Sequence, residues 1–269
     1  MAGMAWDPVQ YLRFEAERAR PFHDLVGRIA VKAPARIVDL GCGPGNVTAT
    51  LLDRWPDATV LGIDSSAEMI AKAAELSGPR LTFAQATIED WQPDGPVDVI
   101  VSNAALQWVP THFDLLAGWV AALTEDGALA FQVPSNVDGD AARAFRAVAA
   151  RPRWADRLAT VAASWGPSQS GGVRPGPEYV DHLARLGCTV DAWLTTYYHV
   201  LPGSDPVLEW YSGTGLRPFL NALDPADRTE LRAEVAAELR KAFPAKDYGT
   251  VLSFQRLFVI AYRRAAVPS

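Results

Sequence analysis

The clearest chemical feature of this chain is a loop with three glycines in five residues. Residues 37–46 read IVDLGCGPGN, and Gly41, Gly43 and Gly45 follow directly on a short β-branched strand. Apolar residues then recur at helical spacing over 47–55. A strand, a tight glycine turn and a helix N-terminus form the context in which backbone can approach a nucleotide-type ligand, because glycine has no side chain. The pattern therefore predicts a nucleotide-type cofactor site in this loop.

Two carboxylates stand where they can serve such a cofactor. Asp39 lies at the end of the first strand, and Asp64 ends the second strand, roughly 20 residues after the loop. At the end of the second strand, the Asp64 carboxylate can accept hydrogen bonds from both hydroxyls of a ribose. The alternative is that Asp64 caps a helix or belongs to a turn. A dinucleotide loop would carry a glycine where Asn46 stands. The loop therefore resembles the S-adenosylmethionine (SAM) loop of class I methyltransferases more than an NAD loop, and Ser65 is assigned to the same cofactor site.

The resemblance to class I methyltransferases implies further cofactor contacts. In that class a residue after the third strand, usually acidic, takes the adenine amino group and an apolar residue packs on the ring; Thr87 and Ile88 occupy these places. Asn103 ends the fourth strand, at the carboxyl edge where doubly wound sheets bind ligands, and is expected to hold the methionine portion. Trp108 is interpreted either as a wall beside the sulfonium, because a ring face favours positive charge, or as a core aromatic.

Short apolar segments alternate with helical patterns in the first half of the chain. Strands are predicted at 35–40, 58–64, 80–86, 97–103 and 127–134. Helices are predicted between them at 46–55, 66–77 and 112–123. Apolar strands that alternate with helices indicate a parallel sheet covered on both faces.

The regular alternation of short apolar strands and helices ends at Pro134. The remaining elements are expected as a helix at 140–163, a Gly-, Pro- and Ser-rich loop at 165–178, a helix at 179–186, and long strands at 188–201 and 250–264. The loop is interpreted either as a lid or as a solvated linker.

The predicted fold class is α/β, a doubly wound, seven-stranded, Rossmann-like sheet of the class I methyltransferase type with an inserted, mainly helical cap. In that class the last strand lies antiparallel beside the fifth. The chain is expected to form a single domain over 1–269. Its parts are expected at 1–134 (N-terminal helix and SAM-binding half), 135–187 (helical cap with a lid loop at 165–178) and 188–269 (C-terminal strands with inserted helices at 205–243).

Composition narrows the classes of function. The chain has 269 residues, a net charge of −6 and two cysteines, Cys42 and Cys188. An acidic balance argues against a nucleic-acid partner, which usually meets a basic surface. No apolar run reaches the roughly 18 residues that cross a bilayer, no secretory signal is visible, and two cysteines suit a reducing compartment without metal spacing. We therefore expect a cytoplasmic monomer with no nucleic-acid, membrane or metal partner.

Segments outside the glycine loop carry a narrower resemblance. Seven segments together resemble the trans-aconitate 2-methyltransferase family over nearly the whole chain: WDPVQYLRFEAERARPF, VDLGCGPGN, GIDSSAEMI, SNAALQWVP, TTYYHVL, GTGLRPFL and FQRLFVIA. The first segment and the last three carry the narrower resemblance, because a broad superfamily shares the cofactor segments. That family transfers the methyl group of SAM to a carboxylate of trans-aconitate and makes a monomethyl ester. The resemblance implies a small polycarboxylic acid as the substrate.

An acidic substrate requires cationic donors, and arginine holds carboxylates with two parallel hydrogen bonds. The candidates are Arg18, Arg217 and Arg256. Arg256 interrupts an apolar face of the last strand, and a buried charge requires an anion, either a structural carboxylate or the substrate. Arg18 and Arg217 are interpreted as substrate contacts or as surface ion pairs. Arg20 is interpreted as an anchor for the SAM carboxylate.

Polar aromatic and imidazole groups complete the predicted substrate site. Tyr11, Tyr197 and His199 can orient the acid, and Trp108 is expected to border it as well. Along a strand, Tyr197 and His199 share one face while Tyr198 takes the other. A structural role for His199 is the alternative.

A carboxylate needs no general base to react, since its reference pKa is near 4. We therefore expect an in-line displacement at the SAM methyl without a catalytic residue, in which the protein positions the reactants and neutralises the other carboxylates. Three alternatives remain: SAM-dependent O-methylation of another small metabolite, an NAD-dependent oxidoreductase with a degenerate loop, and a non-catalytic SAM-binding regulator.

Overall fold

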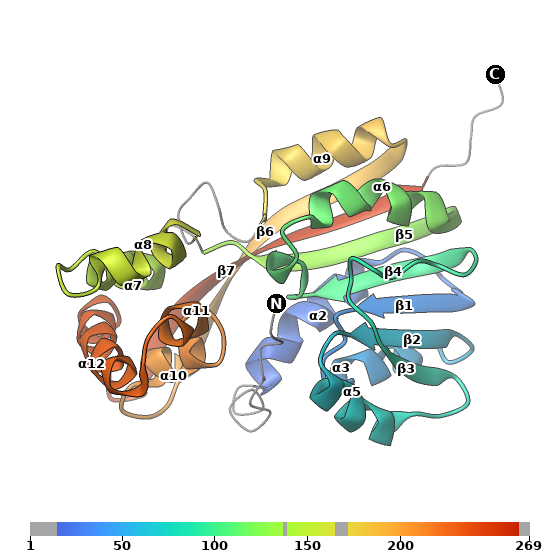
Figure 1. Cartoon of the computed structure of the whole chain (residues 1–269). Helices are drawn as coiled ribbons and strands as arrows, with labels where there is room; N and C mark the ends of the chain where they lie inside the picture. The colour runs from blue at the N-terminus through green and yellow to red at the C-terminus, as the bar shows by residue number, and fades with distance from the viewer. Residues whose placement is uncertain (1–14, 137–138, 165–171, 264–269) are drawn as a thin grey trace.

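The computed structural model describes residues 15–136, 139–164 and 172–263 (Figure 1). Within these ranges seven strands form one sheet in the order β3-β2-β1-β4-β5-β7-β6. Their bounds are β1 Arg36–Leu40, β2 Thr59–Asp64, β3 Leu81–Gln85, β4 Val97–Asn103, β5 Leu123–Pro134, β6 Cys188–Leu201 and β7 Thr250–Arg263. Strands β1 to β5 pair in parallel, and β7 is inserted antiparallel between β5 and β6. The predicted fold class is confirmed, including the last strand beside the fifth.

Helices cover both faces of the sheet, because its central strands are apolar on both sides. Ile37 and Val38 of β1 are neighbours in the chain, point to opposite faces and are each fully buried. One face packs against α6 and α9, and the other against α2, α3 and α4. The helices around the sheet are α2 Glu15–Arg28, α3 Asn46–Ala49, α4 Leu51–Arg54, α5 Ala67–Ala73, α6 His112–Ala122 and α9 Gly176–Arg185, with 3-10 turns η1 Ala74–Leu76 and η2 Leu106–Trp108.

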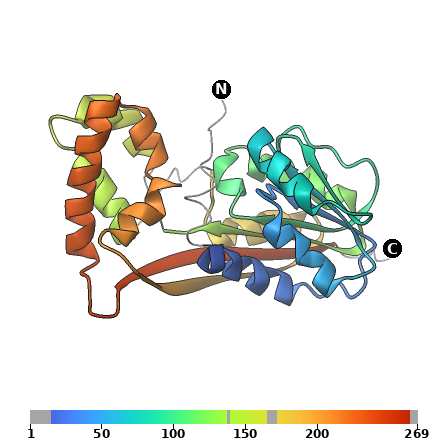
Figure 2. The ribbon, with the colours of Figure 1, turned by 90° about the horizontal axis from the view of Figure 1, so that it is seen from below.

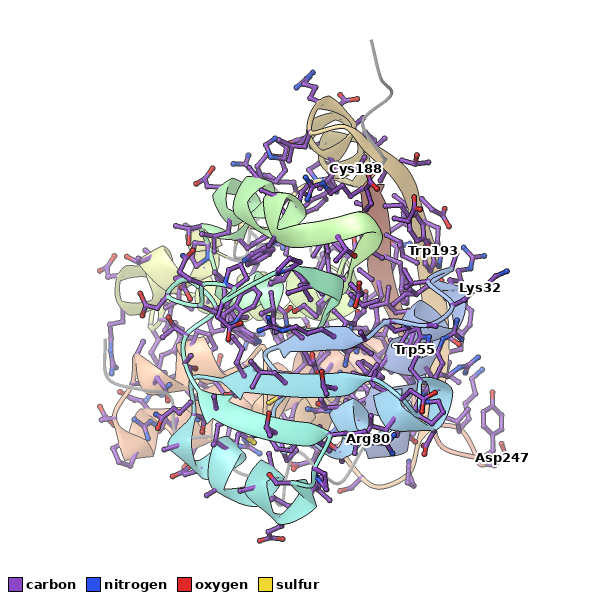
Figure 3. All side chains as sticks on the ribbon, turned by 90° about the vertical axis from the view of Figure 1, so that its right-hand side faces the viewer. Lys32, Trp55, Arg80, Cys188, Trp193 and Asp247 are labelled. Atoms are coloured by element: carbon purple, nitrogen blue, oxygen red, sulfur yellow. The ribbon has the colours of Figure 1, made fainter. Side chains whose placement is uncertain are left out.

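Aromatic residues fasten α2 to its face of the sheet. Trp55 and Trp193, labelled in Figure 3, belong to the hydrophobic layer on this side. Trp193 stacks on Phe258 of β7 with ring centroids 4.9 Å apart, and the Arg28 guanidinium of α2 lies 4.2 Å from the Trp193 ring centroid. Trp55 donates from Nε1 to the Val31 carbonyl at 3.1 Å. The N-terminal helix is thereby held against the last two strands.

A second hydrophobic core lies in a helical cap (Figure 2). The cap consists of α7 Asp140–Ala149, α8 Ala155–Ser164, α10 Pro206–Ser212, α11 Arg217–Asn221 and α12 Pro225–Ala242. Strands β6 and β7 are 14 residues long each and extend beyond the rest of the sheet, so that Leu252 and Phe254 join the core of the cap. The cap therefore stands beside the carboxyl ends of the parallel strands.

The first part of the cap differs from the prediction. The helix predicted over 140–163 is divided into α7 and α8 by a turn at 150–154. Pro152 lies in this turn, and a proline inside a helix removes a backbone donor and clashes with the preceding turn. The interruption lets α7 pack against α12 and α8 pack against α11.

The cap boundaries differ from the prediction as well. Helix α9 was expected inside a cap spanning 135–187, but its Tyr179 and Leu183 are fully buried against the sheet. The helices inserted between β6 and β7 instead join α7 and α8 in one cap core. Of the predicted lid loop 165–178, residues 165–171 lie outside the described residues, and the idea of a lid stays a prediction.

Candidate active site

A cavity of about 800 Å³ lies between the carboxyl edge of the sheet and the cap. Ligand sites in proteins typically occupy roughly 300–1,000 Å³. On the side of the sheet it is lined by Gly41, Gly43, Asp64, Ser65, Thr87 and Ile88. On the side of the cap it is lined by Asn136, Trp210, Tyr211, Thr214, Pro218 and Arg256. One space therefore joins the glycine loop to the helical cap.

Backbone geometry explains why the loop is rich in glycine. Gly41, Gly43 and Gly45 have φ angles of +81°, +57° and +79°, in the left-handed region that favours glycine. The amides of Gly41 and Cys42 both donate to the Ile63 carbonyl at 2.9 Å, which ties the loop to β2. The loop is therefore held in one conformation at the end of β1.

The three glycines differ in what a side chain would meet. A Cβ on Gly41 would collide with the Cβ of Ala105, and a Cβ on Gly45 would come within 2.7 Å of the Phe83 ring. A Cβ on Gly43 has no atom within 4 Å, and this residue lines the cavity. Gly41 and Gly45 are thus required by packing, whereas Gly43 keeps backbone accessible to a ligand.

Two acidic residues flank the loop. Asp39 is 1 % exposed, and its Oδ2 accepts a hydrogen bond from the Thr48 hydroxyl at 2.6 Å. Its Oδ1 is buried and meets no hydrogen-bond partner among the residues the structure describes. Burial, with a smaller contribution from Asp64, raises the pKa of Asp39 to about 7. Asp64 accepts from the amides of Gly43 at 3.0 Å and Ser66 at 2.9 Å, and burial raises its pKa. This pair favours a ligand with positive charge.

The turn after β3 holds the residues predicted to contact adenine. The Thr87 hydroxyl donates to Asp90 Oδ2 at 2.7 Å and accepts from the Asp90 amide at 3.0 Å. Much of its hydrogen-bonding capacity is therefore used to stabilise this turn. Ile88 is 8 % exposed and offers an apolar surface to the cavity.

Asn103, Gln132 and Arg256 form a chain of side-chain hydrogen bonds. Gln132 Nε2 donates to Asn103 Oδ1 at 2.5 Å, and Arg256 Nη1 donates to Gln132 Oε1 at 3.0 Å. Gln132 is fully buried and Arg256 is 4 % exposed, while Asn103 and Arg256 line the cavity. Gln132 was not predicted from the sequence, although a glutamine between Phe131 and Val133 in an apolar strand is a signal of such a site.

Arg18 connects the N-terminal helix to the cap. Its Nη2 donates to the Trp210 carbonyl at 3.3 Å, and its guanidinium carbon lies 5.1 Å from the centroid of the same indole ring. Arg18 lines the main cavity and also a small adjoining pocket that contains Asp39 and Asn103. Trp108, at the end of η2, lines the main cavity too. The structure thus brings Arg18, Asn103 and Trp108 to the same space.

Four other predicted residues are not brought to this cavity or cannot be placed. Arg20 is exposed, with its guanidinium carbon 5.1 Å from the Tyr197 ring centroid, and Tyr197 donates its hydroxyl to Asp24 at 2.6 Å. Arg217 begins α11. The described residues that line the cavity do not include Arg20, Tyr197 or Arg217. Tyr11 lies outside the described residues.

His199 has a packing position rather than a position on the cavity wall. It is 4 % exposed and stacks between Tyr197 and Trp210, with ring centroids 6.0 Å and 4.9 Å away. Burial, followed by the charges of Arg256 and Arg20, lowers its pKa to about 4. The described cavity lining does not include His199, so its position favours the structural alternative.

Comparison with known proteins assigns the chain to a family. The family model described as a methyltransferase domain matches residues 37–127. The trans-aconitate 2-methyltransferase of Streptomyces avermitilis is 48 % identical over 268 residues, which cover 97 % of this chain and 98 % of that protein. Its counterpart from Streptomyces coelicolor is 49 % identical over 265 residues, which cover 95 % of this chain and 86 % of that protein. This chain belongs to the trans-aconitate 2-methyltransferase family. As a member of this family it is a SAM-dependent methyltransferase, which confirms the predicted enzyme class and cofactor.

Solved structures with low sequence identity share the fold of this family member. The YcgJ protein from Bacillus subtilis has a TM-score of 0.59 and 15 % identity, covering 93 % of this chain and 100 % of its own. A SAM-dependent methyltransferase from Thiobacillus denitrificans, in complex with S-adenosyl-L-homocysteine, has a TM-score of 0.52 and 17 % identity, covering 97 % and 100 %. At such identities the likeness concerns the fold alone.

Proposed function

We propose that the protein transfers the methyl group of SAM to a carboxylate of trans-aconitate and produces a monomethyl ester. The observation that carries this proposal is that one cavity contains both the glycine loop and the buried guanidinium of Arg256. A guanidinium matches a carboxylate in charge and in the geometry of its donors. Relatives named for the methylation of trans-aconitate align with nearly the whole chain, cap included.

The residues on the sheet side fit SAM. Gly43 leaves open space at the cavity, and the buried Oδ1 of Asp39 is suited to the ammonium group of the cofactor. Asp64 would accept the ribose hydroxyls, Ile88 would pack on the adenine, and Trp108 would offer its ring to the sulfonium. When bound, SAM supplies an electrophilic methyl group.

The task of the protein is to position an acid that is already ionised. A carboxylic acid has a reference pKa near 4, so no residue has to remove a proton before attack. Arg256 and Arg18 would hold carboxylates that do not react, through charge-assisted hydrogen bonds. Trp210 and Tyr211 would exclude water on the side of the cap. Holding both reactants in one enclosed space then supplies the rate enhancement.

Ester formation tests the proposed substrate directly. Purified protein is incubated with methyl-labelled SAM and trans-aconitate, and parallel reactions contain a monocarboxylate or a hydroxyl compound of similar size. We expect labelled ester from trans-aconitate and little from either control acceptor. Protein that binds S-adenosylhomocysteine but forms no ester from trans-aconitate would reject this substrate, and label in the hydroxyl compound would favour O-methylation of another metabolite.

Substitution of Arg256 tests the acid-binding side of the cavity. Arg256→Met keeps much of the side-chain length but removes the charge. A hydrogen bond to a charged group contributes about 1.5–3 kcal/mol, so we expect the KM for trans-aconitate to rise about 10- to 150-fold. The matched control is Arg263→Met, further along β7, whose Nη1 donates to the Ala121 carbonyl. An equal KM in the two variants would count against Arg256 as a substrate contact.

We further propose that the protein is a cytoplasmic monomer that acts on a free small acid and has no nucleic-acid partner. Its net charge of −6 argues against a nucleic-acid partner. Its two buried free cysteines, Cys42 and Cys188, support a reducing compartment such as the cytoplasm. Within the described ranges no helix is long and apolar enough to span a bilayer. Light scattering measures the mass in solution, and a dimer mass would contradict the monomer.

A further inference from the structure

Gln132 occupies a place where three strands lie side by side. In β5 it pairs with Asn103 of β4 and with Phe258 of β7. Its side chain points to the face covered by α2, because Ala130, two residues earlier in the strand, lies in that layer. Gln132 is fully buried in an apolar environment, so its amide requires hydrogen-bond partners. Asn103 and Arg256 supply them from the two neighbouring strands.

The direction of this hydrogen-bond chain follows from the chemistry of its members. A guanidinium has no acceptor, so the Nη1 of Arg256 must meet the oxygen of the Gln132 amide. The nitrogen of Gln132 is then directed at Asn103, where it can only donate to the Oδ1. Asn103 lines the cavity and is left with its amide nitrogen to offer to a ligand. Arg256 therefore sets the orientation of the Asn103 amide through Gln132.

We propose that Gln132 is a positioning residue that directs N–H donors of Arg256 and Asn103 at carboxylates bound in the cavity. This inference rests on the proposed function, since an anionic acid is the ligand that such donors recognise. Gln132 is not among the described residues that line the cavity, so it acts through its two partners without touching the substrate. The carboxylate at Arg256 belongs to the acid substrate, and the one at Asn103 belongs to the acid or to the methionine part of SAM.

A neutral amide is the side chain that meets both requirements. Glutamate at this position would accept from Arg256 but offset its charge, and it has no proton to donate to the Oδ1 of Asn103 at neutral pH. Methionine, which is similar in length, would make neither hydrogen bond, so the guanidinium of Arg256 and the amide of Asn103 would each lose one of the contacts that orient them. Glutamine accepts from Arg256 and donates to Asn103, so it links β7 to β4 by hydrogen bonds without adding a charge beside the guanidinium.

The test compares Gln132→Met and Gln132→Glu with the wild type. Kinetics give KM and kcat, and calorimetry titrates S-adenosylhomocysteine into free protein and then trans-aconitate into the saturated complex. We expect Gln132→Met to raise the KM and Kd for trans-aconitate about tenfold or more, by loss of hydrogen bonds to charged groups, with a smaller change in kcat. Gln132→Glu keeps a bond to Arg256, and we expect it to fold and to lose more affinity for trans-aconitate. The matched control, Gln255→Met on β7, should behave as the wild type.

The outcomes separate this inference from the proposed function. An unchanged KM and Kd for trans-aconitate in Gln132→Glu would overturn the inference, as would a loss of trans-aconitate affinity in the control Gln255→Met equal to the losses in the two Gln132 variants. Asn103→Leu distinguishes the two carboxylates: a weaker affinity for S-adenosylhomocysteine assigns Asn103 to the cofactor, a weaker affinity for trans-aconitate assigns it to the acid, and no change in either refutes its part. A wild-type protein that neither binds nor esterifies trans-aconitate would refute the proposed function itself.

Discussion

Replacing His199 with phenylalanine is expected to remove part of the sensitivity of the protein to acid. The His199 side chain is 4 % exposed, and its Nε2 is buried with no hydrogen-bond partner in the described part of the chain. It stacks on Trp210 with ring centroids 4.9 Å apart, a contact that a phenyl ring can keep. Burial, together with the positive charges of Arg256 and Arg20, lowers its pKa to about 4. The folded state therefore holds this ring neutral.

The size of the effect follows from proton linkage. The ordinary pKa of histidine is 6.5, so between about pH 6.5 and pH 4 the unfolded chain binds more protons at His199 than the folded protein does. Stability therefore falls as the pH falls through this window. The loss is about 3 kcal/mol when complete, and about 2 kcal/mol of it has occurred by about pH 5. Asp39, whose pKa is raised to about 7, acts in the opposite sense, but it is present in both proteins and cancels in the comparison.

Urea unfolding of the wild type and of His199→Phe at about pH 7.5 and about pH 5 measures this difference. On acidification we expect the free energy of unfolding of the wild type to fall by about 2 kcal/mol more than that of the variant. Tyr198→Phe, on the exposed face of the same strand, is the matched control and should follow the wild type. Equal losses in the wild type and His199→Phe would refute the reasoning that a neutral buried histidine is destabilised by acid.

Three further substitutions or treatments test the packing around the site. Gly62→Ala is expected to lower the free energy of unfolding by about 1–3 kcal/mol and to weaken S-adenosylhomocysteine binding, because its Cβ would lie 2.6 Å from the Phe83 ring. Urea unfolding and calorimetry measure the two effects. If a double variant that also carries Phe83→Leu recovers neither stability nor binding, the clash is not the cause. Tyr179→Phe removes the 2.6 Å hydrogen bond to the buried Nε2 of His112 and should cost about 2 kcal/mol in urea unfolding, so a cost near zero would contradict this account. Burial and the neighbouring acids raise the pKa of the Cys42 thiol, and mass spectrometry should therefore detect its alkylation only after unfolding; rapid labelling of the folded protein would disprove this.

The cofactor half of the molecule was predictable because its signals are local. The loop at 37–46 combines glycines that need positive φ with a strand before it and a helix after it, and all three features can be seen within a few residues of each other. Asp64 could be placed at the carboxyl edge, where it lines the cavity, because parallel strands end at the same edge of a sheet whatever the details of packing. Asn103, placed at this edge for the same reason, lines the cavity.

The substrate half was predicted less completely, because its residues come from distant elements. Trp210 belongs to α10 and Arg18 to α2, and their contact across 192 positions of the chain depends on how the cap stands against the sheet. Arg20, two residues from Arg18, is exposed over Tyr197, although the sequence offers the same cation at both places. The residue types therefore indicated a cationic site, but the sequence did not show which arginine side chain points into the cavity.

Short-range spacing was sufficient for the glycine loop, its acidic partners and the number of strands, because backbone conformation and the alternation of apolar residues act over a few positions. The family resemblance came from the similarity of whole sequence segments. Long-range packing alone determines which of the arginines face the cavity, places α9 on the sheet, and joins Asn103, Gln132 and Arg256 into one hydrogen-bonded row. The physical reason is that this row requires β4, β5 and β7 to be neighbours. The free energy that makes them neighbours is the burial of apolar surface over the whole sheet, which no local pattern contains.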